Sequence, residues 1–140
     1  MPNLAQYTAR FLPGLFFLNS GMTKRNLDDE TAAGMQGFAS AGIPAVAKLD
    51  PATFGKALSA AEIATGAALV APFVPNRIAG AALTAFGAGF MSMYLRAPGQ
   101  KQEGSLAPTQ EGLSLAKDSW LLGTGLSLLI AGDSKKKSKK

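Results

Sequence analysis

A single charged residue inside a long apolar segment constrains this chain more than any other feature. Residues 57–74 read ALSAAEIATGAALVAPFV, and Glu62 is the only charge among them. A carboxylate in apolar surroundings costs several kcal/mol unless it is paired with a cation or protonated. The segment is therefore expected to be a helix whose glutamate has a partner elsewhere in the chain.

Three further apolar segments accompany it, at 5–22, 78–95 and 119–132. The last is short, because its helix would rise only about 21 Å against a hydrocarbon core of roughly 30 Å. Segment 78–95 carries polar groups only at Thr84, Ser92 and Tyr94, so it lacks the polar face of a surface helix. A chain of 140 residues cannot surround several such helices with polar ones. A soluble helical bundle is the alternative that this pattern disfavours.

We therefore predict an all-α fold, an integral membrane four-helix bundle, over residues 1–132, with a Lys-rich cytoplasmic tail at 133–140. The long connection between the first two spans is not structureless by composition. Residues 27–44 begin with acids that suit a helix N-terminus, and Met35, Phe38 and Ala39 share one face. We expect a short amphipathic helix there, on the membrane surface or over the mouth of the bundle.

Two local patterns refine this prediction. Asp50 and Pro51 have the order of an N-cap and a first helical residue. Small residues also recur every four positions, and such stripes let membrane helices approach closely. The stripes are Ala60, Ala64 and Ala68; Ala81, Ala85 and Gly89; and Gly123 and Ser127.

Composition excludes several classes of function. The chain has no Cys and no His, so it offers no disulfide, no thiolate or imidazole metal site, and no Ser-His-Asp or Cys-His machinery. The net charge of +5 comes from the five lysines within 135–140. Without that tail the chain is neutral, which does not fit a nucleic-acid binder. We expect no metal and no covalently bound cofactor, and a quinone or a lipid as the candidate bound molecule.

Charge also bears on orientation. An even number of spans places both termini on one side, and Lys and Arg are divided equally between the two sides. The dense lysine tail then favours both termini in the cytoplasm. The predicted location is the bacterial cytoplasmic membrane, with several passes.

The order of short motifs resembles the DoxX-like family of small four-helix bacterial membrane proteins. The resemblance covers most of residues 10–132 and includes KDSWLLGTGLSLLIAG at 117–132. Its marker residues are Ser20, Gly21 and Lys24 at the end of the first segment, then Gly42, Ile43 and Pro44, then Glu62 and Gly66. The family is linked to thiosulfate–quinone oxidoreduction, to oxidative-stress membrane complexes and to respiratory assemblies.

Glu62 is the centre of the predicted site. Lys24 or Arg25 would be its counter-ion, and Asn19, Ser20 and Thr65 could complete the network. The cluster would hold a quinone, a proton or a small ligand, or it would simply fix two helices in register.

Other polar side chains near the ends of the segments are expected to have structural roles. Trp120, Tyr94 and Tyr7 are expected to anchor the membrane interface, and Lys117 and Asp118 to cap and snorkel.

Three classes of function follow from these expectations. The first is an accessory subunit of a larger membrane complex, most plausibly respiratory or redox, with membrane-protein partners and no catalysis of its own. The second is the membrane subunit of a thiosulfate–quinone oxidoreductase. The third is a small transporter or lipid-handling protein, which would need polar groups along a path through the bundle.

Overall fold

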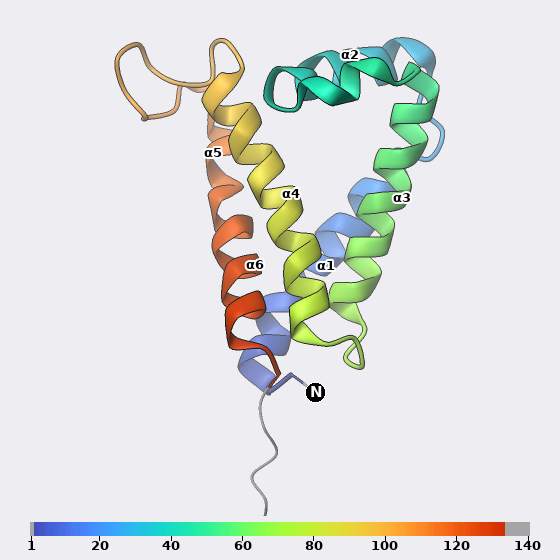
Figure 1. The fold of residues 1–140 in the computed structure, drawn as a ribbon, viewed down its shortest axis with the longest axis vertical. Helices are drawn as coiled ribbons and strands as arrows, with labels where there is room; N and C mark the ends of the chain where they lie inside the picture. Colours follow the sequence, from blue (N-terminus) through green and yellow to red (C-terminus); the bar gives the residue numbers. More distant parts are fainter. Residues whose placement is uncertain (1, 134–140) are drawn as a thin grey trace, which may run out of the picture.

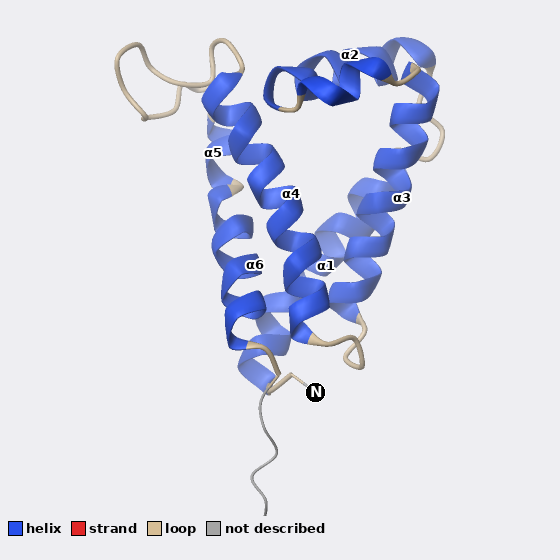
Figure 2. Ribbon diagram, viewed as in Figure 1, coloured by secondary structure: helices blue, strands red, loops and turns tan. Residues whose placement is uncertain are grey.

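The fold is that of a computed structural model, which describes residues 2–133 and whose regular elements are all helices (Figure 2). That range contains no strand, only an isolated bridge between Lys101 and Pro108. The all-α prediction is therefore confirmed, while the lysines at 135–140 lie outside the described residues. The elements are α1 (Leu4–Thr23), α2 (Asp29–Gly42), a short 3₁₀ helix (Pro44–Lys48), α3 (Pro51–Val70), α4 (Asn76–Arg96), α5 (Leu113–Lys117) and α6 (Ser119–Ala131).

The long helices form two antiparallel pairs that are joined at one end only. α1 packs along α3, and α4 packs along α6. The pairs meet near the N-terminus and diverge toward the other end, where α2 lies across the gap and contacts both α3 and α4 (Figure 1). We call these the closed end and the open end of the bundle.

Local signals set the helix ends as the sequence predicts. The Asp28 carboxylate accepts a hydrogen bond from Thr31 N–H at 2.7 Å and caps α2. Asp50 caps α3, with Pro51 in its first turn. The amphipathic helix of the long connection is thus confirmed, as is the Asp50 cap. α3 nevertheless begins six residues before the predicted segment 57–74, because this cap starts the helix rather than a separate short turn.

Glycines bring the helices of each pair into contact. A Cβ added at Gly66 of α3 would lie 2.6 Å from the backbone nitrogen of Leu18, and one at Gly125 of α6 would lie 2.6 Å from that of Thr84. The predicted small-residue stripes are not these contacts, since Ala60 and Ala81 are exposed. A four-residue repeat does not by itself tell which face of a helix is buried. In an Ala-rich chain, the contact glycines could not be distinguished from the other small residues.

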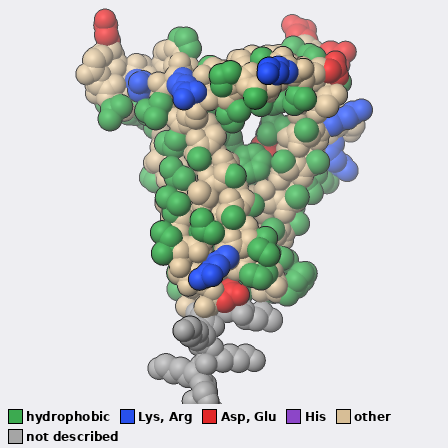
Figure 3. All heavy atoms as spheres, viewed as in Figure 1, with side chains coloured by type: hydrophobic (Ala, Val, Ile, Leu, Met, Phe, Trp, Pro, Cys, Tyr) green, Lys and Arg blue, Asp and Glu red, His purple; other side chains and the backbone are tan. Residues whose placement is uncertain are grey.

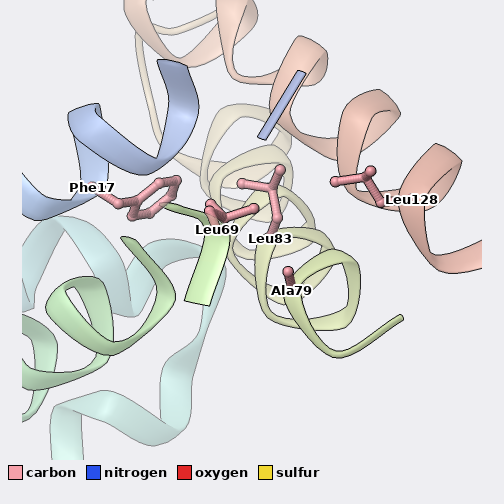
Figure 4. Close-up of a cluster of buried hydrophobic side chains, with 5 residues drawn as sticks. All are labelled: Phe17, Leu69, Ala79, Leu83 and Leu128. Atoms are coloured by element: carbon pink, nitrogen blue, oxygen red, sulfur yellow. The ribbon is translucent and has the colours of Figure 1, made fainter. Parts of the chain in front are cut away.

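An apolar cluster joins the two pairs. Its buried members come from α1, α3, α4 and α6 and point toward one another (Figure 4): Phe17, Leu69, Ala79, Leu83 and Leu128. Phe17 also lies against the rings of Phe86 and Phe90, with centroids 4.9 and 6.5 Å away. This cluster holds the closed half of the bundle together, and the helices beyond it separate.

One described helix is long and apolar enough to cross a membrane by length and composition. It is α4, with 21 residues and a mean hydropathy of 1.5, and only 28% of its apolar window is buried within the protein. α6 has 13 residues, and α5 precedes it with a break at Asp118. The four predicted spans are therefore reduced to one by this criterion.

Candidate functional site

Glu62 lies past the middle of α3 and is paired with Lys24, the residue that follows α1. Lys24 Nζ is 3.0 Å from Glu62 Oε2 and 3.2 Å from Oε1. The ammonium also donates to the hydroxyl oxygen of Ser20, one turn earlier on α1. The side chains of Lys24 and Glu62 are 17% and 5% exposed. The predicted pairing of Glu62 with a cation from the end of the first helix is therefore correct.

Lys24 keeps one donor for another molecule. An ammonium group has three N–H bonds; the two oxygens of Glu62 lie too close together to take more than one of them, and the Ser20 hydroxyl accepts a second. The carboxylate and the hydroxyl keep unused lone pairs. The cluster can thus both accept hydrogen bonds from another molecule and donate one to it.

The ion pair lies in the wall of a cavity of about 650 Å³ between the two helix pairs. Figure 3 shows the molecule hollowed beneath α2, with hydrophobic side chains around the opening. The volume falls within the roughly 300–1,000 Å³ typical of small-molecule sites. The lining is mainly apolar and includes Phe16, Leu58, Phe86, Phe90 and Met93.

α2 forms the roof of this cavity. Met35, Phe38 and Ala39, the residues predicted to share a face, all line it. Hydrogen bonds at Gly42 and Gln36 hold the helix there. The Gly42 carbonyl accepts from the Ser92 hydroxyl of α4 at 2.6 Å, and the Gln36 side-chain amide donates to the Val46 carbonyl at 2.8 Å. The prediction of a helix over the mouth of the bundle is therefore correct.

Asp118 is a third ionisable residue of the cavity wall, and sequence reasoning assigned it a different role. It lies between α5 and α6 and makes no side-chain capping bond to α6. Its partly buried carboxylate lines the cavity. Among the described residues it has neither a hydrogen-bond partner nor an ion-pair partner. Asp118 thus occupies the N-cap position of α6, as predicted, but its side chain does not cap the helix.

The remaining predicted site residues do not join the cluster. Arg25 and Asn19 are exposed and lie outside the cavity lining, and Thr65 is buried but does not line it either. Arg25 follows Lys24 directly in the chain, and only Lys24 reaches Glu62 on α3. The sequence could not tell which of the two would do so.

The closed end holds a second buried charge, which the sequence reasoning missed. Arg10 is 0% exposed and donates five hydrogen bonds, four to backbone carbonyls near the C-terminus of α3 and one to Asn76. The carbonyl acceptors belong to Ala68, Leu69, Ala71 and Val74, at 2.6 to 3.1 Å. A lone arginine in an apolar segment was the available signal, since the end of a helix leaves such carbonyls without donors.

Asn76 carries this network to the C-terminal part of the chain. Its amide donates to the Gly132 carbonyl at 3.1 Å, and its backbone N–H donates to Asp133 at 3.0 Å. Tyr7 adds a bond from its hydroxyl to the Val70 carbonyl at 2.7 Å. All donors of Arg10 are used, and the network is buried. It therefore holds the helices of the closed end together and offers no group to a ligand.

Two of the predicted interfacial aromatics are in fact used inside the fold. Tyr94 is buried and donates to the Leu106 carbonyl at 2.6 Å, while Tyr7 contributes to the closed end. Trp120 is 72% exposed on α6, as an interfacial residue would be. Among residues 2–133 no group of His, Cys, Asp and Glu side chains is arranged to hold a metal ion.

The chain matches no protein-family model, no curated protein and no solved structure.

Proposed function

We propose that this protein is an integral membrane protein of the DoxX-like four-helix type, and that its cavity binds an amphipathic molecule from the bilayer. The observation that carries the proposal is the apolar cavity of about 650 Å³ with a buried ion pair in its wall. An apolar pocket with a few convergent polar groups is the usual form of a small-molecule site.

Exposed apolar side chains support the membrane part of the proposal. Leu4, Ile78 and Ile130 are 83%, 60% and 77% exposed on α1, α4 and α6. Large apolar side chains exposed on several helices at once suit a surface that faces lipid. α4 is mostly uncovered by the rest of the chain, unlike the core helix of a soluble protein.

The helix arrangement is compatible with four spans. α1, α3 and α4 would each cross once, and α5 with α6 would together form the fourth crossing, which remedies the shortness of α6. Both termini would then lie on the cytoplasmic side of a bacterial inner membrane, and the cavity would open at the other side of the bilayer. Glu62 and Lys24 would lie within the bundle, as ionisable residues in membrane proteins do.

The test is whether the purified protein retains a membrane-derived molecule in the cavity. Ala85 of α4 lines the cavity and Ala81, one turn earlier, is exposed outside it. In nanodiscs examined by native mass spectrometry, wild type and Ala81→Phe are expected to carry a bound amphiphile, and Ala85→Phe to lose it. Equal retention in both variants, or no retention by wild type, would contradict the proposal.

An accessory role in a larger membrane complex is the second candidate. α3 presents an outer face of small exposed residues, Ala57, Ala60, Ala61, Ala64 and Ala67. Such a face suits close packing by a helix of another membrane protein. Because the chain has no Cys or His, any redox centre would belong to that partner.

A pull-down in mild detergent tests the accessory role. Respiratory or other redox subunits should co-purify in fixed ratio with wild type and be lost from an Ala64→Phe variant. Ala88→Phe, a matched change at an exposed position of α4, should leave the ratio unchanged. Migration of the wild type alone would remove this candidate and leave the ligand-binding proposal standing.

A further inference from the structure

We infer that the cavity takes an amphiphile whose head group is a hydrogen-bond-donating cation, a primary amine on an apolar chain, and that Asp118 binds this head group. The inference rests on the proposed ligand-binding function and specifies the chemistry of the ligand. It comes from the polar groups that the cavity offers and from their charges.

The carboxylates of the cavity wall differ in what they already bind. The Glu62 carboxylate accepts from Lys24, the only cation in the lining. Asp118 has both carboxylate oxygens available, and an ionised carboxylate can only accept. A head group that donates hydrogen bonds and carries a positive charge therefore suits Asp118, whereas a quinone carbonyl or a phosphate offers it no donor.

The charges of the lining point the same way. Lys24 contributes one positive charge, and Glu62 and Asp118 contribute two negative charges, which leaves one negative charge over. The cation nearest to Asp118 in sequence is Lys117, which is exposed and outside the cavity lining. A partly buried carboxylate in mainly apolar surroundings is stabilised by a cation at short range.

The position of Asp118 also places the polar groups and the apolar groups of the cavity so that they suit the two parts of an amphiphile. Asp118 and Ser114 enter the lining from the α5 side, and Lys24, Ser20 and Glu62 enter from α1 and α3. The rest of the lining is mainly aliphatic and aromatic, with Phe38 and Met35 from the roof. A bound amphiphile can therefore place an ammonium group near the carboxylates and its hydrocarbon chain among apolar side chains.

The alternative is that no ligand is needed, because water and Lys117 satisfy the Asp118 carboxylate. This alternative predicts that the charge of the carboxylate is irrelevant to what the cavity binds. It can be separated from the inference by neutralising Asp118 without changing its shape. Glu103 provides the matched control, since Glu103→Gln also removes one negative charge, from an exposed loop position outside the cavity.

The experiment measures saturable binding of radiolabelled dodecylamine to full-length protein in phosphatidylcholine nanodiscs, after subtraction of binding to empty nanodiscs. Dodecanol and dodecanoate, with the same chain, serve as competitors. We expect binding near one amine per chain, strong competition by unlabelled dodecylamine, and weak competition by the alcohol and the acid. Asp118→Asn should weaken amine binding by at least about tenfold, and Glu103→Gln should leave it unchanged.

The outcomes distinguish the inference from the function on which it rests. If all three amphiphiles compete equally and Asp118→Asn has no effect, the cavity binds amphiphiles but the head-group inference is wrong. If no amphiphile binds above the empty nanodiscs, both the inference and the proposed function are wrong. Circular dichroism of Asp118→Asn, which should match wild type, ensures that lost binding is not lost folding.

Discussion

The two ends of the bundle bury a charge in different ways. At the closed end Arg10 is completely enclosed, and all of its donors reach carbonyls or the Asn76 side chain. At the open end Glu62 relies on one cation, Lys24, and borders a cavity. The closed end is fixed by backbone acceptors that no substitution can remove, whereas the open end is held by side chains that can be exchanged.

The closed end therefore stabilises the fold, whereas the open end is the part of the molecule with groups available for a ligand. A fully satisfied buried network makes a region rigid, while a partly satisfied cluster beside an empty volume has groups left for another molecule. The closed end, with the apolar cluster around Phe17 and Leu69, keeps the two helix pairs together. The open end is thereby free to diverge under α2 and to form the cavity.

Removing Arg10 is the strongest test of the stabilising role assigned to the closed end. Arg10→Met would leave the carbonyls of Ala68, Leu69 and Val74 and the Asn76 amide oxygen without this donor, while the Ala71 carbonyl keeps a bond from Val74 N–H. We expect a loss of about 3–5 kcal/mol in the free energy of unfolding. Unfolding in mixed micelles, followed through Trp120, the only tryptophan, measures this loss. Combining Arg10→Met with Asn76→Leu should not restore stability, because the carbonyls remain. An Arg10→Met variant as stable as wild type would contradict the stabilising role of this network.

A glycine substitution tests whether close helix packing, rather than charge, fixes each pair. Gly66→Ala would place a Cβ 2.6 Å from the Leu18 nitrogen and 2.8 Å from the Gly14 carbonyl oxygen, both backbone atoms. We expect a loss of about 1–3 kcal/mol in the same unfolding assay.

Gly123→Ala is the control for helix propensity. Nothing lies within 4 Å of a Cβ at Gly123, so this change should be neutral or stabilising by up to about 1 kcal/mol. Equal effects at both glycines would mean that the α1–α3 contact is looser than described.

The open end should respond differently to loss of charge. Glu62→Gln leaves the Lys24 ammonium with neutral acceptors, and we expect a loss of about 1–2 kcal/mol, since the lysine is partly exposed. Adding Lys24→Met should recover most of this loss, because the pair can be exchanged for side chains without charge. A double-mutant cycle in mixed micelles measures the coupling. If the double variant is as unstable as Arg10→Met, the two ends do not differ in the proposed way.

The sequence predicted those features that depend on local or general rules. The cap at Asp50, the acidic start of α2 and the shared face of Met35 and Phe38 follow from helix chemistry. The partner of Glu62 follows from the cost of an unpaired charge in apolar surroundings. These rules need no knowledge of how helices are placed.

The features that the sequence did not predict depend on tertiary placement. Arg10 was assigned no role and Asp118 was interpreted as a capping charge, because nothing local shows that one meets the carbonyls of α3 and the other borders a cavity. The cavity itself exists because the helix pairs diverge. The contact glycines Gly66 and Gly125 could not be separated from many other small residues without knowing which faces meet.

The smallest predicted effect concerns the roof of the open end. The backbone N–H of Thr31, and then its side chain, donate to Asp28 and hold the pKa of that carboxyl below its ordinary value of 3.8. A lowered pKa means that the cap contributes fully above the ordinary value, and that the contribution is lost as pH falls through the folded pKa. Hydrogen exchange in detergent should therefore show α2 losing protection in acid while α4 around Leu83, in the buried apolar cluster, stays protected. Asp28→Asn, which still accepts the bond, should make the protection of α2 independent of pH in this range. If acid loosens both ends of the bundle together in wild type, the roof is not attached independently of the closed end.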